Sequence, residues 1–310
     1  YTMDFISLIS KMISFIALML VGYVCVKKNI LDKNFSKGLS FLVMNVFLPC
    51  TILNSVIANH PDISGAQLMH AIAMLSLAML LPYIFAAAAA RLFCRGGKNA
   101  AVFELLCSVI NTMFIGLPIL ESMFGSIAVL YCALSCLSYN LLLYTYGTWR
   151  LRASLDGADH ALHLKSVFTA PFVATLIALI IFVFDVPAPR LVREIVSSVS
   201  VATVPSSMIV VGATLGNARL LDALKEKSVY LISLVRLVLI PAIVLFVLRF
   251  LTDDPVLLAN CVILAACPSA VLVAILSLQY GTDAVYASKG ILVTTALSMV
   301  SLPVWVYILG

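Results

Sequence analysis

The sequence predicts an all-α polytopic membrane protein whose ten transmembrane helices form two inverted five-helix repeats. Three observations predict this fold: the composition, the number of apolar spans and the distribution of basic residues between the two sides of the membrane. Of the 310 residues, 63% are hydrophobic and only 11% are charged, and the mean hydropathy is +1.13. Soluble domains carry roughly 25% charged residues, so no water-soluble domain of any size is expected.

Other features of the composition exclude several functional classes. The net charge of +5 does not require a nucleic-acid partner. The eight cysteines lie mostly inside apolar spans without a CxxC pair or a Cys/His cluster, so we expect neither disulfides nor a metal site, and no cofactor. There is no GxSxG, HExxH or P-loop motif, so neither an enzyme nor an ATP-driven pump is expected. The sequence opens at Tyr1 without a cleavable signal pattern, so its first apolar span is expected to be a membrane helix.

Ten apolar spans follow one another along the chain, and a polar segment divides them into two groups of five. The first group covers residues 5–26, 39–57, 68–93, 100–124 and 127–146. After the polar segment 149–165, the second group covers residues 167–184, 191–215, 229–251, 256–280 and 284–309. A helix that crosses a bilayer needs about 20 predominantly apolar residues, so each span can cross once.

Basic residues are concentrated on one side of this arrangement. Thirteen of the 19 Lys and Arg residues fall in links of that side: Lys27, Lys28, Lys33, Lys37, Arg91, Arg95, Lys98, Arg150, Arg152, Lys165, Arg219, Lys225 and Lys227. Cytoplasmic links carry the excess of Lys and Arg, so we expect a protein of the cell (plasma) membrane with a cytoplasmic central loop and both termini outside. Because five spans precede that loop, the second five begin from the opposite side, which is the pattern of an inverted repeat.

Two pairs of spans carry matched interruptions. The fourth span contains Asn-Thr-Met-Phe-Ile-Gly-Leu-Pro at residues 111–118, and the ninth contains Pro268. The second span contains Pro49, and the seventh contains Pro205. Proline removes a backbone donor and crowds the preceding turn, and matched breaks in two halves of a transporter indicate a binding site. The sequence therefore predicts breaks at Pro118 and Pro268 that face each other near mid-membrane.

These motifs resemble those of the auxin efflux carrier family, which includes plant auxin exporters and bacterial permeases for small organic acids. The resemblance rests on residues 111–118 with Phe124 and Gly125, and on a late set of motifs. That set comprises residues 268–270 (Pro-Ser-Ala), 279–283 (Gln-Tyr-Gly-Thr-Asp), 287–290 (Ala-Ser-Lys-Gly), Thr294, Ser298 and 302–303 (Leu-Pro). Ser269 and Val273 depart from the small or amide residues that relatives often place there, and the large cytoplasmic loop of many plant members is absent.

The resemblance implies a fold with its first repeat over residues 1–149 and its second over residues 150–310. Helices 1, 2, 6 and 7 would form a scaffold, and helices 3–5 and 8–10 a transport core in which the broken helices four and nine cross. It also implies an elevator-type alternating-access mechanism and a homodimer.

The exposed N-terminus of each half-helix would carry free N–H groups and a partial positive charge, which suits an anion. The candidate substrate-binding residues are Asn111, Thr112, Gly116, Pro118, Ile119, Pro268, Ser269, Ala270, Asn45, Pro49, Ser206, Tyr139 and Asn140. Alternatives stay open for several of them, because Asn111 could cap the broken backbone, Asn45 could bond between helices, and a serine could bond back to its own helix.

Three charged residues inside spans are candidates for coupling or for the anion path: Glu121, Glu104 and Arg236. Ionisable residues within membrane spans are functional candidates by default. The alternatives are that Glu121 is stabilised by the dipole in the first turn of its half-helix and that Arg236 extends to the headgroups.

Together these features predict a secondary active transporter or facilitator of small organic anions, such as malate, malonate or auxin-like acids. One alternative is a sodium-coupled symporter of the bile-acid type, which would need a cluster of acidic and amide ligands. The other is a membrane sensor that binds a ligand without transporting it.

Overall fold

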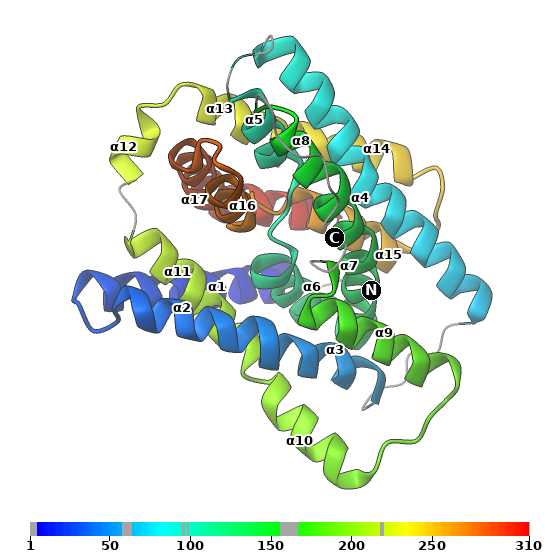
Figure 1. Ribbon diagram of the computed structural model, residues 1–310. Helices are drawn as coiled ribbons and strands as arrows, with labels where there is room; N and C mark the ends of the chain where they lie inside the picture. The colour runs from blue at the N-terminus through cyan, green and yellow to red at the C-terminus, as the bar shows by residue number, and fades with distance from the viewer. Residues whose placement is uncertain are drawn as a thin grey trace.

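The computed structural model describes residues 5–57, 64–94, 97, 99–155, 167–217 and 220–309, and this part of the chain is built from helices (Figure 1). In the first half the helices are α1 (Phe5–Lys27), α2 (Lys33–Leu42), α3 (Leu48–Ile57), α4 (Gly65–Cys94), α5 (Ala100–Ser108), α6 (Leu117–Phe124), α7 (Ser126–Leu142) and α8 (Thr148–Arg152). In the second half they are α9 (Ala170–Val183), α10 (Arg190–Ser200), α11 (Thr203–Asn217), α12 (Leu220–Leu224), α13 (Ser228–Leu234), α14 (Ile240–Leu248), α15 (Pro255–Ala266), α16 (Leu272–Tyr280) and α17 (Ala284–Leu309).

Six helical stretches of the described residues are long and apolar enough to cross a membrane: Phe35–Ile57, Gly65–Cys94, Ser126–Arg152, Arg190–Gly216, Ser228–Leu248 and Ala284–Leu309. Four shorter apolar helices accompany them: Ile13–Lys27, Thr112–Phe124, Ala170–Val183 and Pro255–Ala266. The prediction of an all-helical, multi-pass membrane protein is therefore confirmed.

Side-chain oxygens and glycines mark several helix ends. Asp32 accepts a hydrogen bond from the N–H of Phe35 (2.6 Å), and Asp254 accepts from the N–H of Val256 (2.9 Å), so each carboxylate satisfies an otherwise unpaired donor in a first turn. The turn between α6 and α7 is made by Gly125, whose φ of +66° is a conformation that side chains disfavour.

Within the described residues, four π-helical turns lie along the helices: η1 (Val43–Phe47), η2 (Thr112–Gly116), η3 (Leu143–Gly147) and η5 (Val235–Leu239). Three of them are followed two residues later by proline, at Pro49, Pro118 and Pro241. The proline ring crowds the carbonyl four residues before it, and widening that turn relieves the clash without ending the helix. Proline therefore widens the helix at these positions.

This pattern corrects the predicted breaks at Pro49, Pro118 and Pro205. The helix runs without interruption from α2 through η1 and α3, so Pro49 causes no break. In the fourth span the helix stops at Ser108, and Pro118 lies inside the helix that resumes at Thr112. In the seventh span the interruption is at residues 201–202, and Pro205 lies in the first turn of α11.

Helices α1 and α11 pack backbone to backbone because glycines line their contact. A Cβ added to Gly22 would lie 2.1 Å from the carbonyl oxygen of Ile209, and one added to Gly212 would lie 1.8 Å from the carbonyl oxygen of Met19. Small residues allow such close approach between membrane helices. Any side chain at either glycine would force the two helices apart.

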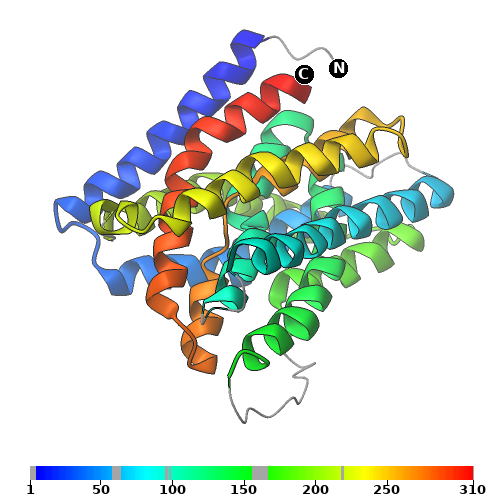
Figure 2. The same ribbon diagram turned by 90° about the horizontal axis from the view of Figure 1, so that it is seen from above.

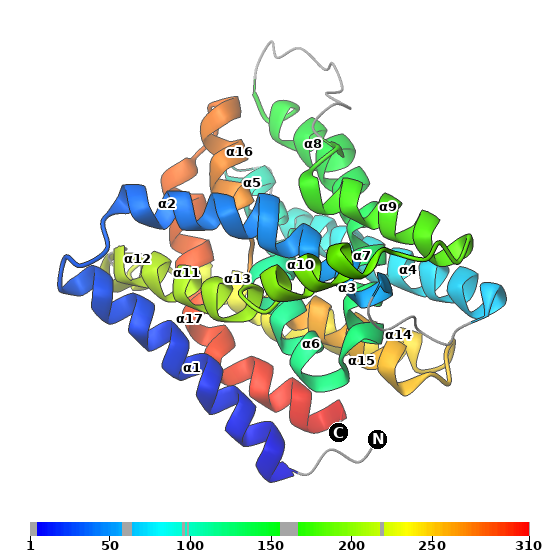
Figure 3. The ribbon, with the colours of Figure 1, turned by 90° about the horizontal axis from the view of Figure 1, so that it is seen from below.

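The start of α1 and the end of α17 lie on the same side of the molecule, whereas α8 lies on the opposite side (Figures 2 and 3). Helix α6 lies near the middle of the view in Figure 1, and it packs against α7, α11 and α15. The buried core runs through α5 and α15, in which most side chains are buried.

Candidate functional site: paired helix breaks and a central cavity

The two interrupted segments of the chain are paired with each other. Helix α5 ends at Ser108 and α15 ends at Ala266, and in each case a short extended stretch precedes the next helix. The N–H of Asn111 donates to the carbonyl of Pro268 (2.9 Å), and the N–H of Ala270 donates to the carbonyl of Val109 (3.1 Å). These two bonds form an antiparallel β-bridge, so each break satisfies backbone groups of the other.

Side-chain bonds fix the same junction. Ser269, which is fully buried, donates its hydroxyl to the carbonyl of Leu106 (2.6 Å), and its N–H donates to Oγ1 of Thr294 (3.3 Å). The side-chain oxygen of Asn111 accepts from the N–H of Phe114 (3.3 Å), which caps the helix that begins at Thr112. Ser269 is thus committed to packing, and the capping alternative for Asn111 holds.

A cavity of about 380 Å³ opens beside these breaks. Its walls come from α2 with η1, the α5–η2 junction, α7 with η3, the start of α9, α11, the start of α16 and α17. Polar side chains and residues of both breaks line it among apolar side chains, and its described walls hold no Asp, Glu, Lys or Arg. A ligand's charge must therefore be met by backbone groups and neutral side chains.

Backbone N–H groups supply that capacity. Among the described residues, the N–H groups of Thr112 and Met113 at the start of η2 have no hydrogen-bond partner, and neither do those of Val271 and Leu272 at the start of α16. All four residues line the cavity. First-turn N–H groups carry the positive end of the helix dipole, so two helix ends present donors to one space.

Six of the predicted site residues line this cavity: Asn45, Asn111, Thr112, Tyr139, Asn140 and Ala270. The amide of Asn45 also donates to the carbonyl of Phe41 (2.9 Å), and that of Asn140 donates to Oγ1 of Thr169 (3.4 Å). These contacts hold both amides in place at the wall.

The remaining predicted residues lie elsewhere: Gly116, Pro118, Ile119, Pro268, Ser269, Pro49 and Ser206 are not among the lining residues. Gly116 faces Leu264 and Cys267, where an added Cβ would lie 2.7 Å and 3.2 Å from their side chains. Ile119 lines a second, small cavity between α1, α6, α11 and α17. The predicted break at Pro118 would put the free N–H groups just after that residue, whereas the helix, and hence its free N–H groups, begins six residues earlier at Thr112.

Glu121 is not in a first turn, because its helix already begins at Thr112. Dipole stabilisation, which falls off within the first turn, therefore does not explain this carboxylate. Its Oε2 atom is buried and has no hydrogen-bond partner among the described residues. Glu121 lies on α6, away from the lining of the central cavity.

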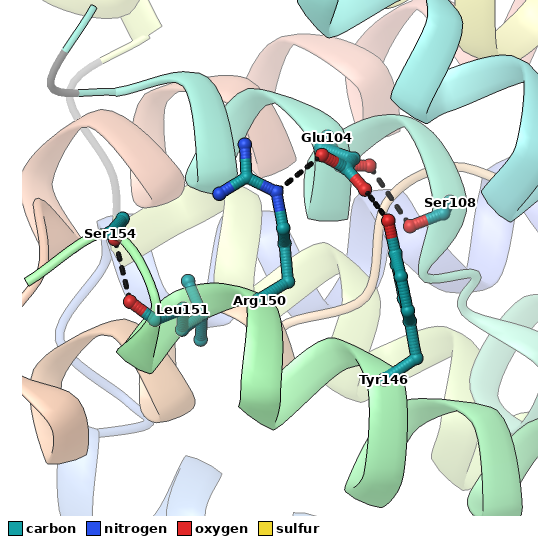
Figure 4. Close-up of polar contacts among 6 residues, drawn as sticks. All are labelled: Glu104, Ser108, Tyr146, Arg150, Leu151 and Ser154. Atoms are coloured by element: carbon teal, nitrogen blue, oxygen red, sulfur yellow. Dashed lines mark hydrogen bonds and ion pairs between the residues drawn. The ribbon is translucent and has the colours of Figure 1, made fainter. Parts of the chain in front are cut away.

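Glu104, in the middle of α5, belongs to a polar cluster with Tyr146 and Arg150 (Figure 4). Its carboxylate accepts hydrogen bonds from the Tyr146 hydroxyl and from Nε of Arg150 (2.8 Å), and only 2% of it is exposed. Both partners come from η3 and α8, which continue the helix that begins with α7. The cluster ties α5 to α8, so Glu104 acts in packing and lies outside the cavity.

Arg236 neither extends to the headgroups nor lines the cavity, because it is fully buried in η5. Its Nε donates to the carbonyl of Cys267 (2.9 Å), and its Nη1 donates to the carbonyl of Cys107 (3.2 Å). These carbonyls belong to the C-terminal ends of α15 and α5. One guanidinium thus caps both helices that stop at the junction.

Several lining residues were absent from the sequence-based set: Ser40, Tyr144, Thr169, Thr214 and Thr295. Thr214 and Thr295 each donate to a carbonyl one turn earlier in their own helix, at 2.8 Å and 2.7 Å. A helical threonine of this kind gives no local signal of its own. Tyr144 lies in the widened turn η3, which no proline follows, so it had no such signal in the sequence, whereas the η5 turn that holds Arg236 is followed by Pro241.

Comparisons with known proteins match this chain to a family of membrane transport proteins. The profile of the membrane transport protein family matches residues 7–160 and 158–306. An uncharacterized transporter of Methanothermobacter thermautotrophicus is 27% identical over 311 residues, covering 99% of this chain and 100% of the relative. An uncharacterized transporter of Methanocaldococcus jannaschii is 26% identical, covering 94% of this chain and 96% of the relative.

The family match spans nearly the whole chain, and both relatives align over nearly their full length. The resemblance to auxin efflux carriers that the motifs indicated is thereby confirmed. Among the described residues no group of three or more His, Cys, Asp or Glu could hold a metal ion. The chain belongs to the membrane transport protein family, of the auxin efflux carrier type.

Proposed function

We propose that this protein is a secondary transporter or facilitator of small organic anions, which bind in the central cavity beside the paired breaks. The observation that carries the proposal is the set of four unpartnered N–H groups, from Thr112, Met113, Val271 and Leu272. Helix N-termini bind carboxylates and phosphates through such groups. Asn111 and Thr112 would add neutral side-chain donors at the same wall.

The cavity favours an anion with an apolar or neutral body over a cation. A cation would meet two positive helix ends and no described carboxylate at the wall. The hydrophobic parts of a ligand would contact Met44, Val210 and Ile275, which also line the space.

Transport would follow from two inverted five-helix repeats, over residues 1–149 and 150–310. In this arrangement the interrupted fourth and ninth spans cross at the junction of Val109 with Ala270. Support comes from the backbone pairing of the two breaks and from the concentration of basic residues in links on one predicted side of the membrane. A core containing both breaks would move past a scaffold that includes the tightly packed α1 and α11, carrying the site across the membrane in an elevator-type motion.

Glu121 is the candidate for proton coupling. Its carboxylate is partly buried on α6, and one oxygen has no partner among the described residues. A carboxylate of this kind is costly to keep charged in an apolar setting. Protonation during part of the cycle would remove that cost.

The test is uptake of radiolabelled malate, malonate and indole-acetate into proteoliposomes under separate proton, sodium and potential gradients. Saturable uptake of at least one acid that an excess of the unlabelled acid suppresses is the expected outcome. Stimulation by a sodium gradient alone would favour the sodium-coupled alternative. Saturable binding without uptake under any gradient would favour a sensor.

A further inference from the structure

Arg236 occupies an unusual position, because it places a full positive charge behind the junction of the two breaks. It is 0% exposed and lies in the π-helical turn η5. A charged side chain is costly within a membrane span and is retained where it has a function. π-helical turns are also frequent at functional sites.

Four helix ends meet at this junction, and their dipoles oppose one another. The C-terminal ends of α5 and α15 bring negative potential, whereas the N-terminal ends of η2 and α16 bring positive potential. Left uncompensated, the two negative ends would cancel much of the attraction that the two positive ends offer an anion. Both negative ends are the ones that Arg236 contacts, through the carbonyls of Cys107 and Cys267.

Arg236 also lies close to the cavity. Three residues of extended chain span at most about 11 Å, so the carbonyl of Cys267 lies within that distance of Ala270 in the cavity wall. Tyr139, another lining residue, is within electrostatic range of the guanidinium. No described carboxylate pairs with Arg236, and its Nη2 atom is buried without a partner. Among the described residues, its charge is therefore opposed by the two helix C-termini and not by a carboxylate.

We propose that Arg236 sets the charge selectivity of the cavity: it neutralises the two helix C-termini and leaves a net positive potential for an anionic ligand. It acts from behind the wall as a specificity-determining residue and does not touch the ligand. This inference rests on the proposed function in taking the ligand to be an anion. Arginine suits the role because it stays charged when buried and donates to two carbonyls at once.

The local potential can be measured without knowing the substrate. Val271, which is 44% exposed and lines the cavity, is replaced by Cys as a reporter. Phe184→Cys, in the exposed link after α9, is the reference position. The rates of modification by an anionic and a cationic methanethiosulfonate reagent are followed by peptide mass spectrometry. The ratio of the two rates at Val271→Cys, divided by that at Phe184→Cys, reports the potential in the cavity.

In the parent protein this normalised ratio should favour the anionic reagent. Arg236→Met and Arg236→Gln should slow the anionic reagent and speed the cationic one by about tenfold each, as for a unit charge at about 10 Å with an effective dielectric constant of about 20, so the ratio should fall about a hundredfold. Arg236→Lys keeps the charge and should stay within about threefold of the parent. Arg249→Met, which removes an exposed cation at the end of α14, is the matched control and should leave the ratio unchanged.

A parent ratio without anion preference would overturn the proposal, and so would folded neutral variants that keep the parent ratio. The parent measurement and Arg236→Lys remain informative if both neutral variants fail to fold, because a lysine variant that loses the anion preference also contradicts a role for the charge. The proposed function fails separately. If no carboxylate is bound or transported but the ratio depends on Arg236, only the identity of the ligand is wrong.

Discussion

At the scale of single residues, Asn111 has two tasks at one position. Its side-chain oxygen caps the helix that begins at Thr112, and its N–H pairs with Pro268, so its backbone and side chain both define the break. The side chain also lines the cavity, which leaves its amide N–H₂ group as a donor for a ligand.

We expect Asn111→Ala to weaken carboxylate binding by about 1–2 kcal/mol, because a hydrogen bond to a charged group is lost. Isothermal titration or a competition assay on the purified protein measures the change. Asn99→Ala is the matched control, since the Asn99 amide bonds to Asp283 at an exposed position outside the cavity. Equal affinities of the parent and Asn111→Ala for the acid that the uptake panel identifies would exclude a contact with the ligand.

The ion pair of Glu104 and Arg150 leads to a prediction on stability. Glu104 is buried, so Glu104→Gln leaves the partly buried Arg150 without its counter-charge. Breaking a buried pair in this way costs about 3–5 kcal/mol, and we expect a clear loss of thermal stability.

The control for this stability prediction is Glu194→Gln, which breaks the exposed pair with Arg190 on α10. Exposed pairs contribute about 0–1 kcal/mol, so its melting temperature should stay near that of the parent. A double variant, Glu104→Gln with Arg150→Met, should recover part of the loss, because no unpaired charge remains. Similar melting temperatures for all of these variants would show that the cluster in Figure 4 contributes little.

At the scale of helices, the positions of the spans could be predicted from the sequence. Apolar runs of sufficient length specify a membrane helix with little help from tertiary contacts. The predicted ends near residues 5, 100, 124, 284 and 309 agree closely with α1, α5, α6 and α17.

The location of the breaks could be predicted only in part. A proline indicates a local departure from the α-helix, but Pro118 lies at a widened turn whereas Pro268 lies in a true break. What decides between them is the partner segment, because Val109 and Ile110 are held extended by pairing with residues 268–270. Such pairing between residues far apart in sequence has no local signature.

This difference predicts opposite outcomes for two proline substitutions. Pro268→Ala adds an N–H that can donate to the carbonyl of Leu264 and extend α15 into the break, whereas Pro118→Ala replaces a residue within a continuous helix. We expect Pro268→Ala to lose most of its transport and Pro118→Ala to retain most of it. Uptake by both variants at matched levels of folded protein in proteoliposomes measures this, and the reverse order would place the critical break at Pro118.

At the scale of the whole molecule, the start of α1 and the end of α17 lie on the same side, and α8 lies on the opposite side (Figures 2 and 3). Combined with the excess of Lys and Arg in the links near α8, this arrangement predicts that the central loop faces the cytoplasm and both termini face outward. Gly157→Cys, whose position is outside the described residues, should react with a membrane-impermeant thiol reagent only after the cells are opened. Labelling of this variant in intact cells would show that the central loop faces outward, opposite to the predicted topology.

The oligomeric state follows from the demands of a moving core. If a core slides past a scaffold in an elevator-type motion, the scaffold must stay fixed in the bilayer, and two copies braced against each other hold it better than one. A homodimer is therefore expected, with contacts through the scaffold helices. Native mass measurement in lipid discs should give twice the chain mass of 33.4 kDa. A single-chain mass at every protein-to-lipid ratio, with uptake retained at the same dilution, would show that one copy suffices for transport.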